Sequence, residues 1–151
     1  MLSAPARAAS GALIPRPQEV TRLDGRFVFT AGIPVVYAPG LELLAEYITG
    51  YIPLQRLDDR TWTTGAALRL SVDPKFDDEA YRLSVTPQGI HIVGGDYGGV
   101  FNGLQTLLQL LPPEVYTGHA TLPLAVAACR IEDAPRFHYR AMMLDVVRTW
   151  M

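Results

Sequence analysis

Three charged side chains bracket or interrupt an apolar run near the C-terminus, and they are the strongest candidates for chemistry in the sequence. Arg140 precedes the run at 142–147, Asp145 interrupts it and Arg148 follows it. Burying such charges costs free energy unless they pair with each other or bind a ligand. The residues alone leave two interpretations equally open: a buried structural pair between Asp145 and Arg148, or a polar ligand site at a strand end.

The run that these charges flank is typical of a strand that is covered on both faces, as in a parallel sheet or a barrel. Its apolar members are Met142, Met143, Leu144, Val146 and Val147. No further segment of the sequence could pair with such a strand on both sides. The pattern therefore predicts the first strand of a larger sheet or barrel that this sequence lacks.

Two other groups of residues invite a catalytic interpretation and favour a structural one. Asp78 and Glu79 are adjacent carboxylates, which can serve acid–base catalysis, but a solvated turn before a strand explains them better. Five glycines resemble a phosphate-binding loop, yet they match neither the dinucleotide-binding nor the P-loop spacing, and no lysine follows them. We expect them to form a tight corner between a strand and a helix. They are Gly94, Gly95, Gly98, Gly99 and Gly103.

The histidines and the cysteine predict no metal or cofactor site. His91, His119 and His138 lie too far apart in sequence for a metal-ligand motif. Cys129 is the single cysteine, which excludes an internal disulfide and any Cys-rich metal site, and it has no catalytic motif around it. No serine lies in a nucleophile elbow. The sequence thus gives no candidate for nucleophilic catalysis.

Composition indicates one globular domain. The chain has 151 residues, of which 49% are hydrophobic and 19% charged. A net charge of -2 gives no electrostatic reason to expect a nucleic-acid partner. No apolar run approaches the roughly 20 residues that a membrane span requires.

The elements organise around residues 79–111. Period-2 alternation predicts a strand at 81–86 and a return strand at 90–94, joined through Pro87 and Gly89. Helical spacing follows over 101–111, and Pro112-Pro113 ends that helix. A second helix is predicted at 41–48, with strands at 26–30, 33–37, 67–72 and 122–131 and a polar loop at 58–65. The order of elements predicts an α+β layer of mostly antiparallel strands that carries two helices.

Four segments resemble the N-terminal part of family 20 glycoside hydrolases, the β-N-acetylhexosaminidases. They are LIPRPQ at 13–18, EAYRLSV at 79–85, GVFNGLQTLLQLL at 99–111 and IEDAPRFHYRAMMLDVVR at 131–148, in the family's order. The last is the most specific. The resemblance implies a small sheet with two helices packed on one face, followed by a (β/α)8 catalytic barrel. It divides the chain into a leader or signal-peptide remnant at 1–12, a non-catalytic α+β domain at 13–136 and the start of the truncated barrel at 137–151.

The resemblance also implies a chemistry. Family members remove terminal N-acetylglucosamine or N-acetylgalactosamine from glycoconjugates with retention, and the substrate's own 2-acetamido oxygen is the nucleophile, an exception to the usual two-carboxylate scheme. Their adjacent acid pair lies further along the barrel, so this chain should hold no catalytic residue. Arg140 is expected to contact the ring hydroxyls of the terminal sugar, with Asp145 and Arg148 as buried polar support.

Two hypotheses follow. The chain is either an inactive N-terminal part of an exo-acting hexosaminidase whose partner is its own missing barrel, or a freestanding carbohydrate- or protein-binding module of the same fold. The unfinished apolar strand favours the first. The alanine-rich leader and the family lead us to expect a periplasmic, cell-surface or secreted protein.

Overall fold

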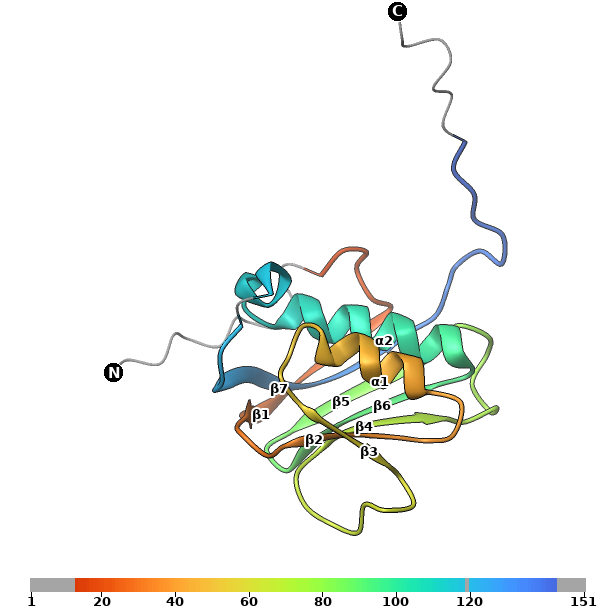
Figure 1. The fold of residues 1–151 in the computed structure, drawn as a ribbon. Helices are drawn as coiled ribbons and strands as arrows, with labels where there is room; N and C mark the ends of the chain where they lie inside the picture. Colours follow the sequence, from red (N-terminus) through yellow and green to blue (C-terminus); the bar gives the residue numbers. More distant parts are fainter. Residues whose placement is uncertain (1–12, 119, 144–151) are drawn as a thin grey trace, which may run out of the picture.

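The structure, a computed structural model, describes residues 13–118 and 120–143, which form a seven-stranded sheet with two helices on one face (Figure 1). The strands are ordered β1-β7-β5-β6-β4-β2-β3 across the sheet. In chain order the elements are β1 (Glu19–Phe29), β2 (Pro34–Tyr37), α1 (Glu42–Thr49), β3 (Gln55–Asp58), β4 (Leu68–Val72), β5 (Tyr81–Thr86), β6 (Gly89–Gly94), α2 (Tyr97–Leu110), a 3-10 turn (Pro113–Thr117) and β7 (Leu124–Asp133).

The β5–β6 hairpin lies at the centre of the sheet, as its alternating pattern predicts. Leu83 pairs with Ile92 and Val85 with Ile90 across the hairpin. All four side chains are buried beneath the helices, whereas the intervening residues are only partly covered. The strict period of two therefore places one apolar face of the hairpin in the core.

Helix α2 packs over this hairpin and begins four residues earlier than the helical spacing predicts. The Asp96 side chain accepts a hydrogen bond of 2.7 Å from the Gly99 backbone N–H, which caps the helix N-terminus. The helix ends at Leu110, just before Pro112 and Pro113, as expected. The sequence does not predict the first turn of α2, because that turn is rich in glycine and glycine is a poor helix former.

The glycine cluster forms the tight corner that the sequence predicts. A β-carbon on Gly99 would overlap the carbonyl oxygen of Ala80, and one on Gly95 would overlap that of Asp77. Gly103 faces Ile92 with equally little space. Only glycine allows the helix backbone to approach the hairpin this closely.

The sheet is mixed, which corrects the expectation of mostly antiparallel strands. The pairs β1–β7, β7–β5 and β5–β6 are antiparallel, whereas β6–β4, β4–β2 and β2–β3 are parallel. Helix α1 is the crossover that makes β2 and β3 parallel. The sequence does not predict the edge strand β3, Gln55–Asp58, because this segment is short and polar and has no alternating apolar pattern. The prediction of an α+β domain with both helices on one face is confirmed.

Beyond β7 the chain leaves the sheet past α2, on the helix side (Figure 1). Residues 137–143 form neither helix nor strand, and Phe137, Tyr139, Met142 and Met143 are exposed there. The rest of the predicted barrel strand and the leader at 1–12 lie outside the described residues. No helix within residues 13–118 and 120–143 is long and apolar enough to cross a membrane.

Two adjacent glycines of α2 test the corner. We expect Gly99→Ala to destabilise the fold by about 2–4 kcal/mol, because its β-carbon meets rigid backbone. Gly98→Ala is the matched control: its β-carbon would meet only side-chain atoms, Glu79 Cγ at 3.2 Å and Asp96 Oδ1 at 3.4 Å, and no backbone atom, so we expect a smaller loss of stability. Urea unfolding of both variants measures the difference, and equal stabilities would contradict the close-approach explanation.

Candidate functional site

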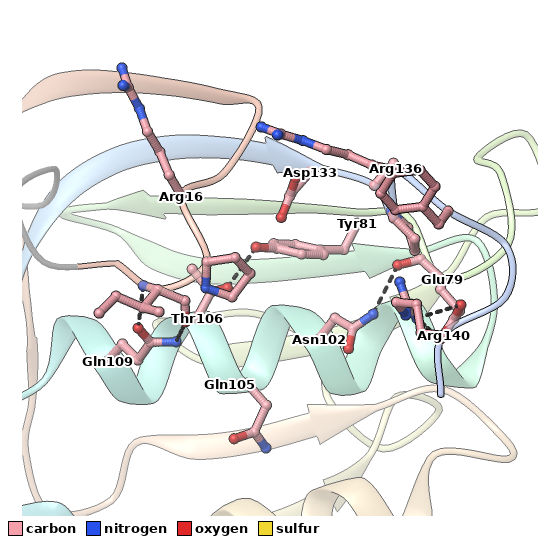
Figure 2. Close-up of a pocket in the computed structure, with 15 residues that line it drawn as sticks. Arg16, Glu79, Tyr81, Asn102, Gln105, Thr106, Gln109, Asp133, Arg136 and Arg140 are labelled. Atoms are coloured by element: carbon pink, nitrogen blue, oxygen red, sulfur yellow. Dashed lines mark hydrogen bonds and ion pairs between the residues drawn. The ribbon is translucent and has the colours of Figure 1, made fainter. Parts of the chain in front are cut away.

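A pocket of about 690 Å³ lies between α2 and the two segments that lead into and out of the sheet (Figure 2). Its floor comes from α2 and the start of β5, and its walls come from residues 14–16 and 133–140. The polar side chains that line it are Arg16, Glu79, Tyr81, Asn102, Gln105, Thr106, Gln109, Asp133, Arg136 and Arg140. The pocket therefore sits where the α+β domain meets its flanking segments.

At one end of the pocket Arg140 binds Glu79. The Arg140 Nη2 donates to both carboxylate oxygens of Glu79, at 2.8 Å each. Figure 2 shows the two side chains meeting beside the first turns of α2. The side chains are 50% and 40% exposed, so solvent screens much of their attraction. The contact holds the outgoing segment against the domain.

Glu79 itself is fixed in an uncommon backbone conformation. Its φ is +58°, and it is the one non-glycine residue with positive φ among those that the structure describes. Its N–H donates to the Asp96 side chain at 3.0 Å, and its carbonyl accepts from the Asn102 side chain at 3.1 Å. Both backbone groups are thus held by α2 and its cap.

The incoming segment is bound to the same helix and to the end of β7. The Gln109 amide accepts from the Ile14 N–H at 2.9 Å and donates to the Ile14 carbonyl at 3.0 Å. The Gln18 N–H donates to the Asp133 carboxylate, and the Gln18 amide donates to the Ala134 carbonyl. The N-terminal segment and the outgoing segment are therefore fixed to each other.

A buried hydroxyl pair lies under the pocket. The Tyr81 and Thr106 hydroxyls lie 2.6 Å apart, and the two residues are only 4% and 7% exposed. Burial raises the pKa of Tyr81 to about 12, and the hydrogen bond with Thr106 only partly opposes this. The phenol stays neutral at physiological pH and acts as a structural hydrogen-bonding group.

The other chemically interesting residues lie outside this pocket and serve the fold. His91 bonds Ser71 at 2.8 Å on the opposite face of the sheet, and its pKa is lowered by burial and by nearby Arg69. Cys129 is buried in the core, where burial raises the pKa of its thiol to about 11. Such a thiol is protonated and inert at neutral pH. Within the described part of the chain no group of three His, Cys, Asp or Glu could hold a metal ion.

Of the predicted site residues the structure describes Arg140 alone, and it places Arg140 against Glu79. Asp145 and Arg148 lie outside the described residues. The sequence predicts that Glu79 belongs to a solvated turn. The turn is present, but the Glu79 carboxylate binds Arg140, 61 residues away in sequence. No local pattern predicts this contact, because it depends on the positive φ of Glu79 and on the path of the outgoing segment, and the sequence predicts neither.

The Tyr81–Thr106 pair gives a prediction at neutral pH. Tyr81→Phe leaves the buried Thr106 hydroxyl without its partner, so we expect a loss of about 1–2 kcal/mol in the free energy of unfolding. The double variant Tyr81→Phe with Thr106→Val should lose less than the sum of the single variants, because it removes both polar groups. Additive losses in urea unfolding would contradict this.

The same tyrosine contributes to alkaline denaturation. An unfolded tyrosine loses its proton near pH 10, whereas folded Tyr81 retains it to about pH 12. Its contribution is therefore present below pH 10 and is lost as pH rises towards 12, by up to about 2.7 kcal/mol. Tyr81→Phe should flatten this part of the stability profile, whereas Tyr139→Phe, at an 85% exposed position, should leave it unchanged.

Known proteins resemble this chain over most of its length. The family model for glycosyl hydrolase family 20, domain 2, matches residues 11–134. A beta-hexosaminidase of Porphyromonas gingivalis is 32% identical over 148 residues, covering 92% of this chain and 19% of that protein.

Solved structures of family 20 enzymes contain a similar fold. The family 20 β-N-acetylhexosaminidase of Streptomyces coelicolor A3(2) superposes with a TM-score of 0.82 at 27% identity, over 95% of this chain and 30% of that one. An exo β-N-acetylglucosaminidase of Vibrio harveyi, solved with N-acetylglucosamine, gives 0.68 at 26% identity, over 92% and 21%. The chain thus spans less than a third of these relatives, and it belongs to glycosyl hydrolase family 20, of which it contains domain 2.

Proposed function

We propose that the full-length protein is an exo-acting, retaining β-N-acetylhexosaminidase that removes terminal N-acetylglucosamine or N-acetylgalactosamine from glycoconjugates. The 2-acetamido oxygen of the substrate bonds to the anomeric carbon as the glycosidic bond breaks and a barrel carboxylic acid protonates the leaving oxygen. Water then gives a proton to the same carboxylate and attacks the anomeric carbon, which breaks the bond to the acetamido oxygen and releases the sugar with retained configuration. Export to the periplasm, the cell surface or the medium is part of the same proposal.

The match to the family 20 domain over residues 11–134 is the observation that supports this proposal most strongly. The relatives it aligns with are named hexosaminidases, and one of them was solved with N-acetylglucosamine. The two carboxylates of the pocket bind other parts of the chain, Glu79 to Arg140 and Asp133 to the Gln18 N–H, and the proposal places the acid–base chemistry in the downstream barrel. In this proposal the α+β domain supports that barrel.

Two arginines flank the apolar run at 142–147, and either has a reason to bind the sugar. Sequence resemblance assigns the sugar contact to Arg140, which binds Glu79 in the structure. It assigns Asp145 and Arg148 to buried support. Barrel active sites lie at the C-terminal ends of the strands, and by that rule Arg148, which follows the run, is the alternative sugar ligand.

The proposal predicts that activity needs the barrel. The 151-residue chain should give no measurable hydrolysis of a chromogenic N-acetyl-β-glucosaminide, whereas the full-length protein should hydrolyse it with retention, as followed by product NMR. Turnover by the chain alone would refute the proposal that activity needs the barrel. Saturable binding of N-acetylglucosamine to the chain in calorimetry would instead support the freestanding carbohydrate-binding module.

Lysine substitution distinguishes the two arginines in the full-length protein. Lysine keeps the charge but loses the planar fork that binds two hydroxyls. We expect the variant of the true sugar ligand to lose about 10- to 100-fold in kcat/KM, the value of a hydrogen bond to a charged group. A large loss for Arg140→Lys alone would support the assignment from resemblance, and a large loss for Arg148→Lys alone would contradict it.

A further inference from the structure

The chain leaves the α+β domain through a short segment that is bound at both ends. At 134 the Gln18 side chain donates to the Ala134 carbonyl, at 2.9 Å. Six residues later Arg140 binds both carboxylate oxygens of Glu79. The exposed side chains of Phe137 and Tyr139 lie between these two attachments. Side-chain contacts, and not strand pairing, therefore fix this part of the chain.

The backbone of Glu79 is held in an uncommon conformation, and from it the carboxylate binds Arg140. A residue with positive φ is disfavoured unless its surroundings impose that conformation, and here Asp96 and Asn102 bind its N–H and carbonyl. Asp96 also caps α2 through the Gly99 N–H. The backbone from which the Glu79 side chain extends is thus attached to the first turns of the helix that packs on the central hairpin.

We propose that Glu79 is a positioning residue: its pair with Arg140 fixes where the chain leaves the α+β domain and so sets the start of the following barrel strand. Arg140 lies two residues before the apolar run at 142–147. Through this pair the helix cap, the turn and the outgoing segment form one connected unit. This inference rests on the proposed function for its barrel, and it assigns Arg140 to the domain junction instead of the sugar.

Limited trypsin digestion of the 151-residue chain tests the pair without any activity. Cleavage after Arg136 requires the residues around it to open, so its rate follows the population of the detached segment. We expect Glu79→Gln and Glu79→Gly to raise this rate up to about fivefold, the range for an exposed ion pair. Glycine at 79 keeps the positive φ, so it removes the carboxylate without straining the turn. Asp78→Asn, at the exposed neighbouring position, should match the wild type.

Charge reversal adds a rescue that general destabilisation does not produce. Glu79→Arg and Arg140→Glu should each accelerate cleavage after Arg136, and the double variant should restore the slow rate. Asp78→Arg combined with Arg140→Glu should give no rescue. Unchanged cleavage in the Glu79 variants, or failure of the double variant to restore protection, would overturn the proposal.

The full-length protein separates this role from a sugar contact. If the pair positions the barrel strand, Arg140→Glu should lose hydrolysis of the chromogenic glucosaminide and Glu79→Arg should restore it. If Arg140 binds the sugar, Glu79→Arg should leave the Arg140→Glu variant inactive, which would overturn the positioning role. An inactive wild-type protein would refute the proposed hydrolase function and leave the trypsin result to decide the pair.

Discussion

The rest of the described structure depends on the close approach of backbone segments at the glycine corner, where the N-terminal turn of α2 meets the β5–β6 hairpin. A β-carbon at Gly94, Gly95 or Gly99 would overlap neighbouring backbone, so the helix can lie on the hairpin only at a glycine corner. Asp96 stabilises this corner because its carboxylate accepts from both Gly99 and Glu79. The corner thereby fixes the helix and the turn before β5 together.

This constraint reaches the pocket through α2. One face of the helix buries leucines against the sheet, and the other presents Asn102 and Gln109 to the segments that pass over it. Because those amides bind backbone groups of Glu79 and Ile14, the helix fixes both the incoming and the outgoing chain. The pocket is thus a junction where main-chain segments are held, and its polar residues are mostly engaged with protein.

The polar side chains around the pocket mostly bind other parts of the domain. Its buried ionisable groups, Tyr81 and Cys129, have raised pKa values and stay neutral at physiological pH. In the proposed function, the contact between Glu79 and Arg140 gives the catalytic barrel a fixed starting point.

Sequence by itself determined the elements with strong local periodicity and the family. The alternation of β5 and β6, the leucine spacing of α2 and the stop at Pro112 are local, because each depends on neighbours in the chain. Motifs such as IEDAPRFHYRAMMLDVVR indicate the family because they, too, are continuous stretches of the chain. Arg140 was singled out by its charge beside an apolar run.

Only the tertiary structure decided the pairing of distant strands and the partner of Arg140. Parallel pairing of β2 with β3 and β4 depends on how α1 crosses over the sheet, and the polar β3 becomes a strand only because β2 offers it an edge. The contact between Glu79 and Arg140 depends on a positive φ imposed by Asp96 and Asn102, and on the route of a segment 61 residues away. Such contacts arise from the path of the chain in space, which no local pattern of residue types encodes.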